Sequence, residues 1–319
     1  MVRIELPSWR GSTDDPTRVI RTIDAWALSP TITALVEVFG GHPPSREPGA
    51  LLDWLDHFSA ARWDFRGGRE RNLASAPQLT VEQEQLVLGS AHVLGLAGQE
   101  SPTRSSYDTV LMTGGMVRAG IVKPRFVAEL LSGGLAVDKV VFLGSFRPFA
   151  GDEVELGRVL GVDGDDEWNS MTAGMEFAFG PLGEPEVSGV TSDSGNGSWR
   201  EYRWTGAGPT LSVLAAPSSA PESRRANSAD TYRFWASRRD EAEQSLLVVT
   251  TPIYVPYQGA AAVEVLGLGL GLAVETVGTS DSANDLGELS QQFTAANHLQ
   301  ELRSAIRAMR SLRFALSAS

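Results

Sequence analysis

The sequence contains no cysteine and only four histidines. A chain without thiols forms no disulfide bond, no thiolate nucleophile and no cysteine-based zinc or iron–sulfur site. The histidines, at positions 42, 57, 92 and 298, are scattered without the spacing of metal ligands. We therefore expect no metal centre, and the lack of cysteine is compatible with a reducing cytosol.

Long apolar runs and an excess of positive charge are lacking as well. The most apolar stretch, from Ala260 to Val274, carries Glu264 and several glycines and is too short to span a membrane. The amino terminus shows no basic-then-apolar signal pattern. A net charge of -12 disfavours a nucleic-acid surface, since phosphate binding needs clustered cations. These features predict a cytoplasmic protein with no membrane and no nucleic-acid partner.

The 319 residues, 42% of them hydrophobic, are enough to bury a large core. Residues 1–100 show helical spacing of apolar residues, with a proline-led helix expected near 16–28. Thr80 and Gln83 form a capping-box pattern that opens a further helix. No clear linker leads from this segment to Tyr107, which favours a helical extension that caps the ligand pocket. A separate domain is the alternative.

From Tyr107 onward, strand patterns alternate with helix patterns. Short buried runs, several of them ending in glycine or serine, predict strands near 107–113, 139–144, 211–216, 246–250 and 272–278. Successive strand–helix units predict a Rossmann-like, doubly wound, mainly parallel sheet of about five strands over residues 101–285. The run from Trp199 to Trp204 predicts an edge strand. Residues 181–198, rich in Gly, Ser, Pro and Asp, predict a flexible loop.

Residues 286–319 predict one long amphipathic C-terminal helix. Its polar face carries a row of arginines, which are Arg303, Arg307, Arg310 and Arg313. This cationic row is compatible with a solvated face, because positive charge suits the last turns of a helix. The alternative is a docking surface for a partner or for a second subunit, which would make the protein a homo-oligomer.

The chemistry is expected where the strand from Leu246 to Thr250 ends. Pro252 cannot donate to a sheet ladder, so this strand must end near Thr251. The chain then turns into a helix, which places Thr251, Tyr254 and Tyr257 at a carboxyl strand end. Ligands of open α/β sheets bind outside these ends, so this is a predicted binding region.

Three common nucleotide-binding and hydrolase motifs are absent: G-x-G-x-x-G, the P-loop and G-x-S-x-G. The most unusual polar run extends from Arg225 to Asp230, between two buried strands. It predicts either an anion site at a helix start, with Arg225 as the cation, or a plain helix cap made by Asn227 or Ser228. The residues alone leave both interpretations open.

The order of five short motifs resembles the YdcF/SanA/ElyC-like domain family over roughly residues 105 to 280. These are D-T-V-L-M-T-G-G, F-L-G-S, D-E-W-N-S-M, R-A-N-S-A-D-T and L-L-V-V-T-T-P-I-Y-V-P-Y-Q-G-A. The matching positions are Asp108, Gly114, Gly115, Gly144, Ser145, Glu167, Arg225, Asn227, Ser228 and Asp230. The last motif departs from the family, because Tyr254 and Tyr257 stand where the family has His and Arg.

The resemblance implies a pocket at the strand ends and, for some members, binding of S-adenosylmethionine or another nucleotide-like ligand. We expect a small-molecule enzyme, transferase-like or hydrolase-like, acting on a nucleotide-like or amino-acid-derived metabolite. A ligand-binding or regulatory protein that has lost turnover with the His and Arg is the alternative. The candidate catalytic residues are Glu167, Asp230 and Tyr254. The candidate ligand-binding residues are Gly114, Gly115, Ser145, Arg147, Arg225, Asn227, Ser228, Thr251 and Tyr257.

Overall fold

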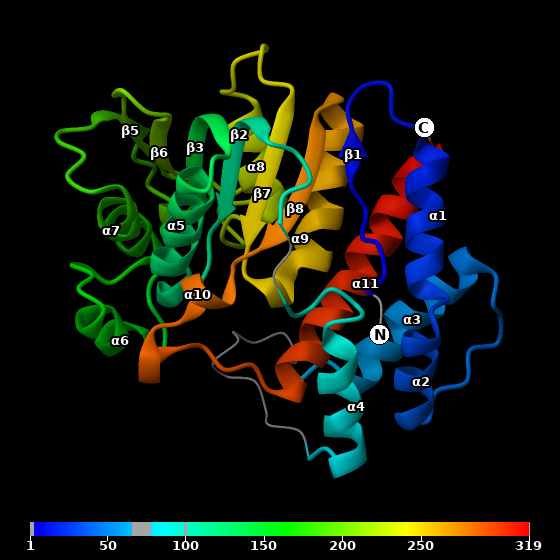
Figure 1. Ribbon diagram of the computed structural model, residues 1–319. Coiled ribbons are helices and arrows are strands. Elements are labelled where there is room, and N and C mark those ends of the chain that lie inside the picture. The colour runs from blue at the N-terminus through cyan, green and yellow to red at the C-terminus, as the bar shows by residue number, and fades with distance from the viewer. Residues whose placement is uncertain (1–2, 66–77, 99–100, 319) are drawn as a thin grey trace.

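The computed structural model describes residues 3–65, 78–98 and 101–318. An eight-stranded sheet runs through it in the order β1-β8-β7-β2-β3-β6-β5-β4 (Figure 1). The five central strands are parallel: β8 (Ala273–Gly278), β7 (Ser245–Thr250), β2 (Ser106–Thr113), β3 (Ala136–Gly144) and β6 (Thr210–Ala215). Antiparallel strands flank them: β1 (Trp9–Arg10) on one side, β5 (Trp199–Trp204) and β4 (Glu186–Val190) on the other. The predicted α/β class with a mainly parallel sheet is confirmed, but the sheet has eight strands instead of about five.

The strands that the sequence pattern misses are short and weakly patterned. Strand β4 lies inside residues 181–198, where the composition predicts a loop, and this correction has a clear reason. All of its residues are exposed, so it lacks the apolar alternation that marks a strand. Because β4 pairs with β5, the expected edge strand at Trp199–Trp204 is second from the edge. A short 3₁₀ turn, η2 (Gly195–Gly197), precedes β5.

Helices cover both faces of the sheet (Figure 1). Side chains alternate between faces along a strand, so Met112 of β2 joins one hydrophobic cluster and Leu111 joins another. The cluster around Met112 is covered by α5 (Val117–Ser132) and α7 (Glu167–Phe179), with α6 (Glu153–Val159) and α10 (Asp281–Asn284) beside α5. The other cluster is covered by α8 (Ser228–Ala236), α9 (Val255–Ala262) and α11 (Ala295–Ala318). Burial on both faces explains the continuous apolar runs of the central strands.

The N-terminal helices share the second of these clusters. They are α1 (Pro16–Ala27), α2 (Pro30–Val38), α3 (Pro48–Arg62) and α4 (Val81–Ala91). The first three begin with a proline behind a residue whose side chain accepts an N–H of the first turn, namely Asp15, Ser29 and Glu47. Helices α1, α3 and α4 pack against α11, which in turn packs on α9. Helix α11 therefore connects the N-terminal helices to the sheet.

Helix α11 is shorter than the sequence predicts. It begins at Ala295 instead of 286, because Thr294 and Asn297 cap it reciprocally: each backbone N–H donates to the other's side-chain oxygen, at 2.9 and 3.3 Å. A 3₁₀ turn, η5 (Gly287–Leu289), lies in the residues before it. Two further irregular helices lie in the described residues, η3 (Pro252–Tyr254) before α9 and the π-helical η4 (Val263–Leu268) after it.

The cationic row of α11 faces the N-terminal segment of the same chain. Three of its arginines form ion pairs with acidic residues there: Arg303 with Asp64, Arg310 with Asp53 and Arg313 with Asp24. Arg307 and Arg310 are exposed, so part of the row is solvated as expected. The docking of a partner or a second subunit on this row stays a prediction. Of the helices in residues 3–65, 78–98 and 101–318, none has the length and apolar content that crossing a membrane requires.

Candidate functional site

The direction of winding reverses between β2 and β7. From β2 the chain continues through β3 to β6 on one side, and β7 is followed by β8 on the other side. At the carboxyl ends of these two neighbouring strands the Thr113 hydroxyl donates to the Thr250 hydroxyl at 2.9 Å, and both side chains are buried. The loops that leave the five parallel strands gather at this edge, so the sequence-predicted site residues lie around it.

A completely buried lysine lies under this edge. Lys123 of α5 has no exposed surface, and its Nζ donates to the carbonyl oxygens of Thr113 and Gly114 at 2.5 and 3.0 Å and to the Thr113 hydroxyl at 3.1 Å. Sequence reasoning missed it because lysines are rarely buried. A signal was present, since Lys123 lies three residues after Gly120 and four before Val127, both on the buried face of α5.

Glu167 joins the loops that follow β2 and β3. Its carboxylate accepts the N–H of Gly115 at 2.5 Å, and the N–H and hydroxyl of Ser145 at 2.9 Å each. Burial raises the pKa of Glu167, although the charge of Arg147 and these hydrogen bonds act in the opposite direction. The backbone N–H groups that the sequence offers to a ligand at Gly115 and Ser145 thus bind the protein's own carboxylate.

A second carboxylate occupies the N-terminal end of α5. Glu153 accepts the N–H of Val117 at 2.9 Å, and it forms a two-point ion pair with Arg147 at 2.7 and 2.9 Å. Burial acts to raise the pKa of Glu153, but Arg147 and the N–H donors outweigh it and lower the pKa. Arg147 also donates to the Gly115 carbonyl at 2.9 Å. In dinucleotide-binding folds the first turn of such a helix holds a phosphate. In this protein the Glu153 carboxylate occupies that position.

The polar run before α8 forms a helix cap. Asn227 and Asp230 make a capping box, because each backbone N–H donates to the other's side chain at 3.0 Å. Arg224 pairs with the Asp230 carboxylate. Burial acts to raise the pKa of Asp230, but the hydrogen bonds from Arg224 and Asn227 lower it to about 2. Ser228 accepts a hydrogen bond at 3.0 Å from Gln258 of α9.

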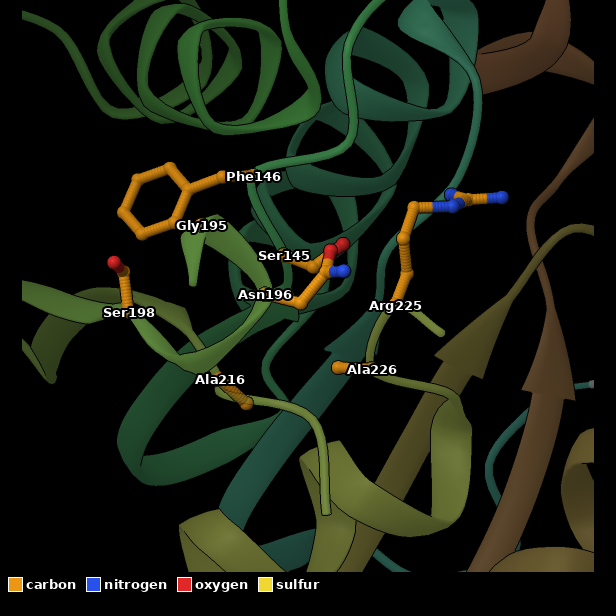
Figure 2. A pocket seen from close by; sticks show the side chains of 8 residues that line it. All are labelled: Ser145, Phe146, Gly195, Asn196, Ser198, Ala216, Arg225 and Ala226. Atoms are coloured by element: carbon orange, nitrogen blue, oxygen red, sulfur yellow. The ribbon is translucent and has the colours of Figure 1, made fainter. Parts of the chain in front are cut away.

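A small pocket lies at the carboxyl ends of β3 and β6 (Figure 2). It has a volume of about 10 Å³, roughly the space of one water molecule. Ser145, Arg225 and Asn196 all line it, and Asn196 belongs to the loop before β5. In Figure 2 the Arg225 guanidinium points away from Phe146, so its aliphatic part forms the wall of the pocket.

The predicted residues after β7 lie elsewhere along the same edge. Thr251 caps η3, where its carbonyl accepts the N–H of Tyr254 at 2.9 Å. Tyr254 and Tyr257 are partly buried against the cluster under α9. Neither tyrosine lines the pocket beside Ser145. The roles assigned to them from the sequence stay predictions.

The structure thus divides the predicted residues into three groups. Glu167 joins the loops of Gly114, Gly115 and Ser145, and Arg147 closes the same hydrogen-bonded cluster through Gly115. Asn227, Ser228 and Asp230 belong to the cap of α8, and Thr251, Tyr254 and Tyr257 belong to the start of α9. Arg225 lines the pocket together with Ser145 of the first group. No group of histidine, aspartate and glutamate suited to a metal ion occurs within the described residues.

Comparisons with known proteins place the chain among its relatives. A family model described as the Rv3785 N-terminal domain matches residues 10–95. The uncharacterized proteins Rv3785 of Mycobacterium tuberculosis (strain ATCC 25618 / H37Rv) and Mb3814 of Mycobacterium bovis are each 32% identical over 317 residues, covering 91% of this chain and 88% of the relative. The chain belongs to the Rv3785 family. No solved structure matches it.

This family assignment corrects the resemblance drawn from the short motifs. Neither the matching family model nor the relatives point to the YdcF/SanA/ElyC-like family. The motifs misled because Gly-Gly after a first strand and a capped polar run before a helix are solutions that many parallel sheets share. In this Rv3785-family protein the residues from Asn227 to Asp230 form the cap of α8. Gly114 is explained by close packing, which leaves no room for a side chain there. A Cβ on Gly114 would lie 2.6 Å from Oε1 of Glu167.

Proposed function

We propose that this Rv3785-family protein binds a small anionic metabolite over the carboxyl ends of β2, β3 and β6, in a Rossmann-like, doubly wound sheet. The parallel strands, numbered in chain order, run 5-4-1-2-3, which is the order of doubly wound sheets. In such sheets the ligand lies outside the carboxyl ends, beside the reversal of winding. Here the reversal lies beside Thr113 of β2 and Thr250 of β7, and the pocket lies further along the same edge, at the ends of β3 and β6.

The observation that carries the proposal is the pocket at this edge, which Arg225 lines. Two further cations lie around the loops after β2 and β3, but Lys123 is buried against backbone carbonyls and Arg147 pairs with Glu153, so neither faces the pocket as a free charge. Arg225 lines the pocket together with the Ser145 hydroxyl and the Asn196 amide. The Asn196 amide has a second N–H that can donate to a carboxylate or phosphate group, and we propose that the Arg225 guanidinium turns toward the pocket when such a group binds.

The pocket has to open before it admits a metabolite. Its volume of about 10 Å³ is far below the roughly 300 Å³ of small ligand pockets. The loop Gly195–Ser198 forms one wall and has an exposed Asn196, so we propose that this loop moves outward on binding. The ligand class is a nucleotide-like or amino-acid-derived metabolite. S-adenosylmethionine, which only the rejected resemblance implied, is one member of the test panel.

A second candidate function, an enzyme, is favoured by the state of Glu167. This carboxyl is buried, its pKa is raised, and it lies 2.9 Å from the Ser145 hydroxyl that lines the pocket. Buried groups with raised pKa values recur among general acids and bases. Asp230 is a weaker candidate, because a pKa of about 2 leaves it ionised and a poor base.

The test of binding is a thermal-shift and calorimetry screen against nucleotides, sugar phosphates, amino acids and S-adenosylmethionine. A ligand at about 100 times its dissociation constant adds roughly 2.7 kcal/mol to the free energy of unfolding. The shift should disappear in Arg225→Ala and persist in Arg158→Ala, a control at an arginine that is 70% exposed. A ligand that binds both variants equally would place the site elsewhere, and no response to any of the panel would reject the proposed ligand class.

The test of catalysis follows once a ligand is known. Glu167→Gln should lower the rate by about 10² to 10⁴ if the carboxyl transfers a proton in the reaction. Under the binding proposal the same variant changes affinity and no turnover is seen in either protein. Circular dichroism of Glu167→Gln must match the wild type, because Glu167 also joins two loops.

A further inference from the structure

A second cavity lies far from the strand ends, among the N-terminal helices. It has a volume of about 190 Å³ and is enclosed by the end of α1, by α2, by the loop 39–47 and by α3. Its inner wall consists of buried aliphatic side chains, namely Ile32, Val36, Leu51 and Leu55. It shares no lining residue with the pocket beside Ser145.

The size of this cavity suits one apolar side chain. An apolar cavity of about 150 Å³ accommodates benzene, so about 190 Å³ accommodates a ring or a branched aliphatic chain. Protein interiors are otherwise closely packed, and an unfilled cavity removes contacts from its lining. A cavity of this size with an open mouth is therefore a candidate ligand site.

The mouth carries one carboxylate and one guanidinium, together with the exposed imidazole of His42. Glu37 on α2 and Arg46 in the loop before α3 both line the cavity and are both exposed. Within the described residues neither side chain forms an ion pair or a hydrogen bond with another residue. Asp and Glu side chains nearby are engaged: Asp24 pairs with Arg313, and Glu47 caps α3. Glu37 and Arg46 thus remain available to a ligand.

The loop that carries Arg46 is held in place at its start. The Gly41 N–H donates to the Val36 carbonyl at 2.8 Å, and a Cβ on Gly41 would lie 2.6 Å from side-chain carbons of Val36 and of Phe58. Because the backbone at Gly41 is packed this closely, the entrance to the cavity keeps a defined position beside α2.

We propose that this cavity binds an α-amino acid with an apolar side chain. The side chain occupies the aliphatic interior, Arg46 binds the carboxylate and Glu37 binds the ammonium group. A purely anionic amphiphile would leave Glu37 facing a like charge, which is unfavourable. A neutral apolar compound would use neither charge at the mouth. A zwitterion with an apolar side chain matches both the interior and the mouth.

The experiment compares ligands that differ in one charged group. Binding of L-leucine and L-phenylalanine to the full chain is measured by calorimetry, alongside leucinamide, which lacks the carboxylate, and 4-methylpentanoate, which lacks the ammonium group. Each missing charge should weaken binding by about tenfold or more, because a hydrogen bond to a charged group is lost. Failure of both amino acids to bind at about 10 mM, above the roughly 1 μM to 1 mM range of KM values that enzymes show for their substrates, would overturn the proposal. So would binding of either analogue as tightly as L-leucine.

Variants locate the site and separate it from the strand-end pocket. Ala27→Leu fills the cavity from α1 and should abolish binding, whereas Ala25→Leu, exposed on the same helix, should bind as the wild type does. Arg46→Gln, on the exposed rim, should fold normally and bind leucine at least about tenfold more weakly. Arg225→Ala should leave leucine affinity unchanged. Wild-type affinity in both Ala27→Leu and Arg46→Gln would refute the proposal.

Discussion

Replacing Asp230 by asparagine should destabilise the protein at neutral pH and much less in acid. The carboxylate accepts hydrogen bonds from Arg224 and from the Asn227 backbone, and these lower its pKa from the ordinary 3.8 to about 2. Asparagine keeps an acceptor for the Asn227 N–H, so the cap of α8 is largely preserved. What the variant loses is the charge that pairs with Arg224.

The size of the effect follows from the pKa. A fall from 3.8 to about 2, at about 1.36 kcal/mol per pKa unit, corresponds to about 2.4 kcal/mol. The Arg224 side chain is 38% exposed, so solvent screening reduces this to about 1 to 2 kcal/mol. Because the folded pKa is lower than the unfolded one, this stability is complete above about pH 4. It is lost as the pH falls from about 4 to about 2.

The assay is urea unfolding of the wild type, Asp230→Asn and Glu222→Gln at pH values from about 7 down to about 3. Glu222 is an exposed carboxylate nearby with no side-chain partner among the described residues, so its variant should match the wild type throughout. The difference between wild type and Asp230→Asn should shrink by roughly half at about pH 3. A difference that stays constant with pH, or that is absent at pH 7, would refute the assignment of Asp230 to this ion pair.

Three further predictions concern the packing around the site and α11. Gly114→Ala should lower the free energy of unfolding by about 1 to 3 kcal/mol, because its Cβ would lie 2.6 Å from Oε1 of Glu167. The control Gly89→Ala, in open space on α4, should raise the free energy of unfolding by about 0.5 to 1 kcal/mol. A Gly114→Ala variant as stable as the wild type would contradict the close packing at Gly114. Glu167→Gln should lower the free energy of unfolding in urea by about 1 to 3 kcal/mol, because an amide cannot accept all three hydrogen bonds that Gly115 and Ser145 donate. A variant as stable as the wild type would mean that other contacts join the two loops. A double-mutant cycle on Arg313 and Asp24 should give a coupling energy of about 0.5 to 1 kcal/mol. The variants should sediment with the same mass as the wild type, and a change of oligomeric mass would instead support a docking surface on α11.

Local sequence signals located most elements. The strand ending at Thr250 and the capping box of Thr80 with Gln83 are both present as the pattern predicts. Strand β4 escaped because its residues are all exposed and carry no apolar alternation. The start of α11 was placed too early, because apolar residues such as Leu286 and Phe293 continue the helical spacing into a segment that the cap at Thr294 excludes.

The sequence predicts at which edge of the sheet the candidate residues lie, but it does not predict the contacts among their side chains. The carboxyl ends of the parallel strands were expected to gather Gly115, Ser145 and Glu167, and the structure brings these three together. That Glu167 would itself bind the two loops could not be read from the chain, because the Glu167 and Gly115 positions are 52 residues apart. The burial of Lys123 beneath Thr113 also depends on how α5 packs on the sheet.

The local part of the structure follows directly from the order of the residues. Apolar periods, prolines and caps act between residues a few positions apart, so they specify strands and helix starts wherever the segment lies. Tertiary structure alone decided which charges meet: Arg313 reaches Asp24 across 289 positions, and the cavity beside Arg46 exists only where three helices pack imperfectly. The physical reason is that ion pairs, hydrogen bonds and cavities depend on distance in space, which the spacing of residues along the chain does not specify.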